Sequence, residues 1–501
     1  MRLNRNTCFR GMAALMMLFP CFASSTFSQK TNSPKIEAWV TNPDRSALFM
    51  KQPESISFGN DGGYGLPIII DDAQSFQTMD GFGFAMTGGS AFHLKNMSDD
   101  ARAKILRELF ATDGNNIGIS YIRMTIGASD LNSFVYSYDD VPDGKTDFDL
   151  KKFDLGEDKY AVIPVMKEIL AINPNIKILA SPWSAPKWMK VSNDVRGGAL
   201  KPECYDVYSR YFVKYIQAME KEGIHLDAIT IQNEPLNSRN TPSMPMSWDE
   251  QATFVKNNLG PAFKAAGLTT KIVVFDHNCD RPDYPLAILN DPEAAQYVDG
   301  SAFHHYRGDV NTMSAVHIAR PDKNIYFTEQ MVTERPGSAN INITDPVKRL
   351  IIGVPRNWSK NVILWNLAAD KNNDPHTDNG GCSMCQGAIT IDGNDVTRNV
   401  AYYVVAHAAK FVRPGSVRIS STNTSDQTVD ITEDEQNALI KRATIIERSN
   451  VLPNVAFKTP DGKIVLIVAN DSRTASSVKI QYNGQFANLK LAPGAVGTYI
   501  W

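Results

Sequence analysis

A short apolar segment that ends abruptly on polar residues constrains this chain more than any other feature. Residues 228–231, Ala-Ile-Thr-Ile, are rich in β-branched side chains and lack a helical period, which predicts a buried strand. The strand runs directly into Gln-Asn-Glu-Pro at residues 232–235. An amide and a carboxylate are costly inside a core, but they are expected at the C-terminal mouth of a barrel, where that fold carries its chemistry.

A second segment repeats this arrangement further along the chain. Residues 324–328 form another apolar run, and the next residue is Glu329. Two glutamates that each close a buried strand predict a carboxylate pair for cleavage of a glycosidic bond. We expect Glu329 to attack the anomeric carbon and form a glycosyl-enzyme. Glu234 would protonate the leaving oxygen and then deprotonate water.

These two roles make different demands on their surroundings. Glu234 must be protonated, so we expect a raised pKa, to which the negative charge of Glu329 would contribute. Glu329 must stay ionised, and Arg123 at a predicted strand end is the expected counter-charge. Glu334 competes for the nucleophile role, but we expect it to be a solvated loop residue.

The segments between residues 76 and 410 alternate between predicted strands and helices. The eight predicted strands end at, or lead into, residues 80, 123, 181, 233, 276, 304, 329 and 365. Ser98 is a plausible N-cap for a helix over residues 101–110, and Ser247 and Glu250 form a capping box. Eight such units predict a (β/α)8 TIM barrel of the α/β class with long loops, whose rim collects the polar strand ends.

The two ends of the chain have a different pattern. Residues 29–75 contain short strands separated by turn residues, and residues 411–501 contain short alternating strands divided by Asn-, Ser- and Gly-rich turns. The first group has no obvious partner before the barrel. We therefore predict an appended all-β sandwich that is built from both the N-terminal and the C-terminal segments.

Residues 1–28 have the features of a secretory signal peptide. Arg2, Arg5 and Arg10 precede a short apolar run over residues 11–22, and small residues follow it. Lipid anchoring at Cys21 is less favoured, because proline precedes that cysteine. We expect a secreted or periplasmic protein. Later apolar runs are too short for a membrane span.

The formal net charge of −3 gives no reason to expect a nucleic acid or an anionic membrane as partner. We expect no partner other than the substrate, and a monomer.

Cys382 and Cys385 lie in a polar, glycine-rich stretch of a protein expected to be exported. A local disulfide is therefore the favoured interpretation. A zinc site would need further ligands, which Cys204 and Cys279 could supply only if the fold happened to bring them close.

A metal site is suggested by Asp276, His277, His304 and His305. Neighbouring residues on a strand point to opposite faces, so His304 and His305 cannot both bind one ion from the same strand. We predict no metal and no cofactor.

Aromatic and amide side chains complete the predicted substrate site. Trp183 and Trp365 are suited to stacking on sugar faces, although filling of the core is an equally good interpretation of each. Asn233, beside the predicted acid, is suited to a hydrogen bond with the sugar 2-hydroxyl.

Several motifs resemble glycoside hydrolase family 30, which includes lysosomal glucosylceramidase and microbial β-1,6-glucanases. The motifs are Asp-Gly-Phe-Gly-Phe at 80–84, Arg123 with Ser129-Asp130, Ser-Pro-Trp-Ser-Ala-Pro-Lys-Trp-Met-Lys at 181–190, Asn-Glu-Pro at 233–235, His304 with Tyr306, Thr-Glu at 328–329, and Trp-Asn-Leu-Ala at 365–368. The resemblance implies that Asp130 binds sugar hydroxyls and that His304, Tyr306, Trp365 and Asn366 belong to the substrate site.

The resemblance also directs the choice of substrate. The segments around residues 188–190 and 232–236 look more like those of β-1,6-glucanases than of animal glucosylceramidases. We expect a retaining endo-β-1,6-glucanase. The alternatives are an exo-acting β-glucosidase or glucosylceramidase and, in another class, a non-catalytic glycan-binding protein, in which one of the two glutamates would be expected to be replaced.

Overall fold

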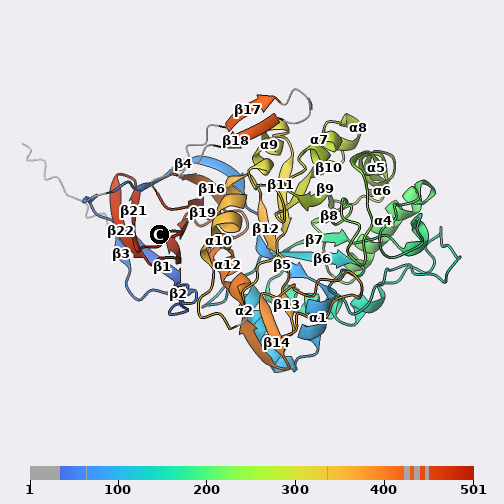
Figure 1. The fold of residues 1–501 in the computed structure, drawn as a ribbon, viewed down its shortest axis with the longest axis horizontal. Coiled ribbons are helices and arrows are strands. Elements are labelled where there is room, and N and C mark those ends of the chain that lie inside the picture. Colours follow the sequence, from blue (N-terminus) through green and yellow to red (C-terminus); the bar gives the residue numbers. More distant parts are fainter. Residues whose placement is uncertain (1–33, 64, 336, 423–428, 434–440, 446–450) are drawn as a thin grey trace, which may run out of the picture.

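The computed structural model describes residues 34–63, 65–335, 337–422, 429–433, 441–445 and 451–501. A barrel surrounded by helices and a β-rich part that contains strands from both ends of the chain lie side by side (Figure 1). The predicted signal peptide, residues 1–28, lies outside the described residues.

Eight parallel strands form the barrel, in the order β11-β10-β9-β8-β7-β6-β5-β12. They are β5 Gly81–Met86, β6 Tyr121–Ile126, β7 Lys177–Pro182, β8 Ala228–Thr230, β9 Lys271–Asn278, β10 Val298–His304, β11 Asn324–Glu329 and β12 Asn361–Leu364. Parallel bridges from Ile325 to Ser359 and from Met331 to Trp365 link the two ends of this order. The predicted (β/α)8 barrel is confirmed.

Helices connect the strands and cover the outside of the barrel (Figure 1). They are α1 Gly88–Lys95, α2 Asp99–Phe110, α3 Val162–Ile172, α4 Tyr205–Lys221, α5 Trp248–Phe254, α6 Gly260–Ala265, α7 Asp283–Leu289, α8 Pro292–Ala295, α9 Thr312–Ala319, α10 Thr344–Pro346, α11 Val354–Arg356 and α12 Val400–Ala409. Both predicted caps are present: Ser98 accepts from the Ala101 N–H at 3.4 Å, and Ser247 and Glu250 form the capping box of α5.

Short turns of other helical types complete this part. They are the 3₁₀ turns at Gly156–Lys159, Lys187–Met189 and Pro202–Cys204 and the π turns at Val255–Leu259 and Val347–Gly353. The first π turn joins α5 to α6, so the helix predicted after the capping box continues to Ala265.

A ten-stranded sheet joins the two ends of the chain. Its strands are β1 Lys35–Thr41, β2 Met50–Lys51, β3 Ile56–Ser57, β4 Ile68–Thr78, β16 Val417–Ser421, β19 Asn454–Lys458, β20 Ile464–Ala469, β21 Ser476–Tyr482, β22 Gln485–Leu491 and β23 Val496–Ile500. Strand β23 pairs antiparallel with β1 on one side and with β20 on the other. The predicted composite sandwich is therefore confirmed.

Smaller sheets flank these two structures. The three-stranded one contains β13 Ala368–Ala369, β14 Ile389–Asp392 and β15 Asp395–Arg398, and the two-stranded one contains β17 Val429–Glu433 and β18 Lys441–Ile445. The segment between β13 and β14 carries the Cys382–Cys385 disulfide, which confirms the predicted pairing.

Two local expectations need correction. The first barrel strand is Gly81–Met86 itself, because residues 76–78 belong to β4 and pair with β16. Arg123 lies in the middle of β6 and not at its end, since that strand continues to Ile126.

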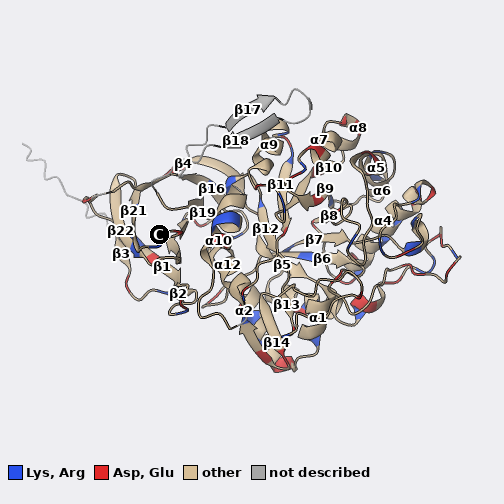
Figure 2. Cartoon of the chain, in the orientation of Figure 1, with Lys and Arg blue, Asp and Glu red and all other residues tan. Residues whose placement is uncertain are grey.

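Among the described residues, no helix is long and apolar enough to cross a membrane. Basic and acidic residues are scattered over both parts of the molecule (Figure 2).

Candidate active site

A cavity of about 700 Å³ opens at the C-terminal ends of the barrel strands. Its lining includes six of the ten predicted site residues, namely Asp130, Trp183, Glu234, Tyr306, Glu329 and Trp365. The other four, Arg123, Asn233, His304 and Asn366, are buried and are not part of the lining. Three of these four contact the two glutamates directly or through one neighbour, as described below.

The two predicted catalytic glutamates approach each other across this cavity. One carboxylate oxygen of Glu234, one of Glu329 and a ring nitrogen of His304 all lie within 4.8 Å of one another. Both glutamates are at least nine-tenths buried. Strands β8 and β11 thus bring two carboxylates from distant parts of the sequence to one place.

Arg123 is the cation beneath Glu329. Its Nη1 donates to Glu329 Oε2 at 2.6 Å, and its Nη2 donates to Asp276 Oδ2 at 2.8 Å and to Asn233 Oδ1 at 2.7 Å. The expected counter-charge is therefore in place. The bond to Asn233 fixes the orientation of that amide, so its Nδ2 is the group that Asn233 can offer to a ligand.

Asp276 is the centre of the buried network, although we did not predict it as a site residue. Its Oδ2 accepts from Ser181 at 2.8 Å and from Thr230 at 2.7 Å, and its Oδ1 accepts from Thr328 at 2.6 Å. Burial raises the pKa of Asp276, but Arg123 and His304 outweigh it and hold the pKa far below its usual range. Asp276 is therefore a permanent anion.

A distortion of β9 explains why Asp276 faces inward. Phe275 and Asp276 both have positive φ, at 75° and 64°. The pairing of β10 with β9 shifts at the same point, between Ala302 and Phe303. A bulge of this kind rotates the following side chains relative to a regular strand. Strand-end position was the only sequence signal for this residue.

His304 lies between the carboxylates. Its Nδ1 is 3.3 Å from Glu234 Oε1, and its Nε2 is 3.0 Å from Asp276 Oδ1. Burial lowers the pKa of His304, but the charge of Glu329 and the contacts with Asp276 and Glu234 raise it to about 9. The imidazole is therefore protonated at neutral pH. His305 points elsewhere and contacts Arg349, as the strand alternation predicts.

The expected pKa pattern of the two glutamates is reversed in the structure. Burial raises the pKa of Glu234, but the His304 imidazolium, with smaller effects of His277 and Asn237, lowers it to about 2. Burial also raises the pKa of Glu329 and exceeds the opposing effects of His304 and Arg123. The expectation failed because the sequence did not show that the imidazolium would lie against Glu234.

Backbone contacts hold Glu234 in an unusual conformation. Its φ is 47°, in the left-handed region that non-glycine residues rarely occupy. The Glu234 N–H donates to the Asp276 carbonyl at 3.0 Å, and Asn237 Nδ2 donates to Glu234 Oε2 at 2.7 Å. Asn237, three residues past the strand end, is a site residue that the sequence analysis missed.

His277 is a second missed site residue. It lines the cavity, and its Nε2 lies 3.9 Å from Glu234 Oε1. Burial lowers its pKa to about 4, so this imidazole is neutral. Its Nδ1 accepts from the Leu236 N–H at 3.4 Å, which leaves the proton of the neutral ring on Nε2, facing Glu234.

Tyr306 and Asp130 complete the polar lining. The Tyr306 hydroxyl donates to Glu329 Oε1 at 3.1 Å, so each oxygen of Glu329 has its own donor. Burial, together with the charges of Glu329 and Glu234, raises the pKa of Asp130 to about 8.

The two tryptophans contact each other. Their ring centroids are 5.3 Å apart and their planes differ by 26°, and both rings line the cavity although each is only 2% exposed. They belong to a cluster with Ala85, Leu131 and Cys385. The pair thus fills space and also presents an aromatic surface to the cavity.

Asn366 lies away from the glutamates. Its Oδ1 accepts from Ser90 at 2.6 Å and from Thr87 at 3.1 Å, which ties the end of β12 to the start of α1. Glu334 is also outside the cavity lining. It is not solvated as expected, because Arg45 donates to it at 2.6 Å and only 10% of its side chain is exposed.

The cluster of Glu234, His304 and Glu329 is compact enough to hold a metal ion. A protonated imidazole, however, has no lone pair for a metal. With the pKa of His304 raised to about 9, the arrangement favours proton transfer over metal binding.

Comparison with known proteins agrees with this geometry. Residues 79–412 match the glycosyl hydrolase family 30 TIM-barrel domain, and residues 415–499 match the family 30 beta sandwich domain. An endo-1,6-beta-D-glucanase of Neurospora crassa is 37% identical over 371 residues, which cover 71% of this chain and 75% of that protein.

Two further relatives extend the comparison. Lysosomal acid glucosylceramidase of Mus musculus is 27% identical over 470 residues, which cover 88% of this chain and 84% of that protein. The solved structure of the endo-beta1,6-glucanase BT3312 is 33% identical with a TM-score of 0.81, and the match covers 93% of this chain and 99% of that one.

Proposed function

The chain belongs to glycosyl hydrolase family 30 and is a glycoside hydrolase, and from this premise we propose that it is an endo-β-1,6-glucanase that acts with retention. Two relatives named as endo-β-1,6-glucanases are 37% and 33% identical to this chain, against 27% for the mouse glucosylceramidase. This difference supports a β-1,6-linked glucan as the substrate.

One observation carries the proposed mechanism, namely the spacing of the carboxylates. Retaining enzymes hold their two carboxyl groups about 5–5.5 Å apart, whereas inverting enzymes keep about 6.5–9.5 Å between them to admit a water molecule. Oxygens of Glu234 and Glu329 lie within 4.8 Å of each other. This spacing leaves room for a covalent intermediate and not for a water molecule between the two groups.

In the first step, Glu329 attacks the anomeric carbon as the bond to the leaving oxygen breaks. Arg123 and Tyr306 each hold one oxygen of Glu329, and this orients the carboxylate. Glu234 gives a proton to the leaving oxygen. Asn233, through its Nδ2, and Asp130 would bind hydroxyl groups of the sugar.

His304 supplies the proton that Glu234 needs. Attack removes the negative charge of Glu329, which is the largest of the neighbouring effects that raise the pKa of His304. The proton then passes from His304 Nδ1 across 3.3 Å to Glu234 Oε1 as the leaving oxygen accepts one from Glu234. The low pKa of Glu234 before the attack is thereby reconciled with its role as an acid.

In the second step, Glu234 takes a proton from water. The water oxygen bonds to the anomeric carbon, and the bond between that carbon and Glu329 breaks. The charge restored on Glu329 raises the pKa of His304 again, so the proton returns to the imidazole. Each substitution inverts the anomeric centre, and two substitutions retain its configuration.

The proposal includes the cellular setting. We propose that residues 1–28 are removed on export and that the mature protein acts outside the cytoplasm as a monomer. The charged and apolar pattern of these residues and the Cys382–Cys385 disulfide support export. The mass of the exported protein tests cleavage against lipidation at Cys21, and light scattering tests the monomer.

Product analysis tests the substrate and the mode of action. Short oligomers released early from a β-1,6-glucan, with a β-1,3-glucan left intact, are the expected result. Nuclear magnetic resonance of the first product should show the β-anomer. Glucose released from an aryl β-glucoside, with the β-1,6-glucan untouched, would replace the proposal by an exo-β-glucosidase or a glucosylceramidase.

A further inference from the structure

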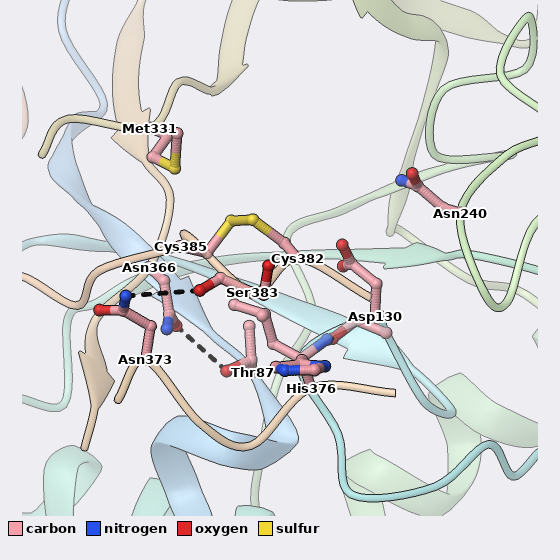
Figure 3. The surroundings of a disulfide bond; sticks show 12 residues. Thr87, Asp130, Asn240, Met331, Asn366, Asn373, His376, Cys382, Ser383 and Cys385 are labelled. Atoms are coloured by element: carbon pink, nitrogen blue, oxygen red, sulfur yellow. Dashed lines mark hydrogen bonds between the residues drawn. A yellow bond between two sulfur atoms is a disulfide. The ribbon is translucent and has the colours of Figure 1, made fainter. Parts of the chain in front are cut away.

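A turn closed by a disulfide bond forms one wall of the cavity. Cys382, Met384 and Cys385 all contribute to the cavity lining. Cys385 is buried and packs in the cluster that contains Trp183 and Trp365. Figure 3 shows the disulfide beside Asp130 and Asn366, with Asn240 on the far side of Asp130.

The segment that leads into this turn is fixed to two other loops of the barrel rim. The Thr377 N–H donates to the Asp130 carbonyl at 2.9 Å, and Thr241 Oγ1 donates to the Asn379 carbonyl at 2.8 Å. Gly380 has a φ of 133°, and a Cβ there would lie 2.6 Å from the Arg239 carbonyl oxygen. The loops after β6 and β8 thus hold the approach to the disulfide in one place.

Met384 is exposed on this turn, as is Ser383 beside it, whereas Cys385 is buried. At 66%, its exposed fraction is the largest among the large apolar side chains that the structure describes. The disulfide joins its two flanking cysteines, and the Gln386 N–H donates to the Met384 carbonyl at 2.9 Å. An unbranched thioether is held at the mouth of the cavity, where it contacts solvent unless a ligand covers it.

A sugar ring is a ligand that such a side chain suits. The faces of a β-linked glucose carry axial C–H groups, which pack on apolar surfaces while the hydroxyl groups project outward. Met331, on the same cavity wall, adds a second thioether, and Asp130 and Asn240 supply polar groups for hydroxyls. Apolar surface with a few polar groups around it is the usual composition of a ligand site.

Resting on the proposed function, we propose that Met384 on its disulfide-closed turn is the platform for a glucosyl unit adjoining the one that is cleaved. A substrate with at least two β-1,6-linked units before or after the scissile bond would cover Met384. A small aryl β-glucoside would fill only the space between Trp183 and the two glutamates. The turn would therefore favour chains over monoglucosides.

The test compares kcat/KM on β-1,6-gluco-oligosaccharides with kcat/KM on an aryl β-glucoside. Met384→Ala should lower the ratio of the two constants about three- to tenfold, mainly through KM for the oligosaccharide, because apolar contact area is lost. Met384→Leu keeps an apolar side chain of similar volume and should restore the ratio. Met50→Ala is the matched control, since Met50 is 52% exposed on β2 of the sandwich sheet.

A second arm tests the disulfide. The double substitution Cys382→Ser and Cys385→Ser removes the disulfide that closes the turn. The ratio of kcat/KM on the oligosaccharide to kcat/KM on the aryl glucoside should then fall. Thermal unfolding of the double variant shows whether the fold persists. If the ratio changes less than twofold in Met384→Ala, the proposed role of Met384 as a platform is wrong. A ratio that falls in Met384→Ala but not in the double serine variant overturns the part assigned to the disulfide.

The outcomes also separate this inference from the proposed function. If the wild-type enzyme releases no product from β-1,6-gluco-oligosaccharides, the proposed substrate is wrong, and the platform falls with it. If the wild-type enzyme cleaves them and Met384→Ala cleaves them equally well, the proposed function stands and the platform alone is wrong.

Discussion

Two layers of side chains fill the barrel, two or three residues apart along the same strands, and they differ in almost every property except burial. The lower layer consists of Tyr121, Leu179, Ala228, Val273, Ala302, Tyr326 and Ile363. The upper layer includes Arg123, Ser181, Thr230, Asp276, His304 and Thr328, and each of these is at most 3% exposed.

The difference shows that burial alone does not separate scaffold from site. Burial of the apolar side chains in the lower layer is favourable and stabilises the folded state. In the upper layer the same burial is unfavourable for each ion. The pairing of Arg123, Asp276 and His304 with one another, with the two glutamates and with neighbouring hydroxyl groups offsets it. The lower layer thus stabilises the barrel. This stability allows the fold to keep the charged groups of the upper layer buried.

Substituting the glutamates should have the largest effect. Glu329→Gln and Glu234→Gln should each lower kcat by about 10⁴-fold or more, because the nucleophile or the proton donor is lost. The thermal midpoint should change little, since Arg123 and His304 both keep their pairing with Asp276. Full activity in Glu329→Gln would refute the nucleophile assignment. Glu334→Gln, outside the cavity, is the matched control and should stay active.

Substituting the central anion should damage both stability and activity. Asp276→Asn leaves Arg123 and His304 without their shared partner, and the free energy of unfolding should fall by about 3–5 kcal/mol. Urea titration measures this change. Asp149→Asn, which removes a surface carboxylate, is the comparison and should behave like the wild type. Equal midpoints for the two variants would mean that the network is not held by Asp276.

Creating a cavity in the lower layer should lower stability without lowering activity. Leu179→Ala should lower the free energy of unfolding by about 2–5 kcal/mol, while kcat/KM of the folded enzyme stays within twofold of wild type. Leu179→Met keeps the volume and should cost less than about 1.5 kcal/mol. A large loss of activity in a folded Leu179→Ala enzyme would show that the layers are coupled.

Raising the pH should deprotonate His304 in the upper layer and thereby lower both stability and activity. The pKa of His304 is raised above its usual value of 6.5 to about 9, so its stabilising effect is complete below pH 6.5 and is lost as the pH rises through about 9. Activity should fall over the same upper range, because the proton for Glu234 disappears. His304→Gln should remove this alkaline limb and lower kcat, whereas an unchanged limb would assign it to another group.

Removing metals should have the smallest effect. Prolonged dialysis against a chelator is expected to leave kcat/KM unchanged, because the protonated ring of His304 has no lone pair to offer an ion. The control is the chelator-treated enzyme with added zinc or calcium. Loss of activity that an added ion restores would show that Glu234, His304 and Glu329 form a metal site.

The sequence predicted which residues lie at the ends of the barrel strands better than it predicted the contacts within the upper layer. The polar residues after buried strands located Glu234 and Glu329, since strand ends of a barrel converge whatever their separation in sequence. The bulge at Phe275 and Asp276 broke the alternation, so the inward position of Asp276 could not be derived from a period of two.

The pKa shifts of the two glutamates were harder to predict than the positions of the site residues. Which carboxylate faces His304 depends on side-chain directions at the ends of β8 and β10, and those follow from the left-handed turn at Glu234. Asn237 and His277 were missed for a similar reason, because both act within that turn.

Strand β23 has a consequence for the order in which the protein is made. It lies between β1 and β20, so one edge of the first described strand is completed by residues 496–500, near the other end of the chain. During synthesis, the N-terminal segment emerges first, and this edge of β1 stays unpaired until β23 has been made. A break in translation just before β23 would release a chain whose barrel sequence is whole but whose sheet lacks the strand that joins β1 to β20.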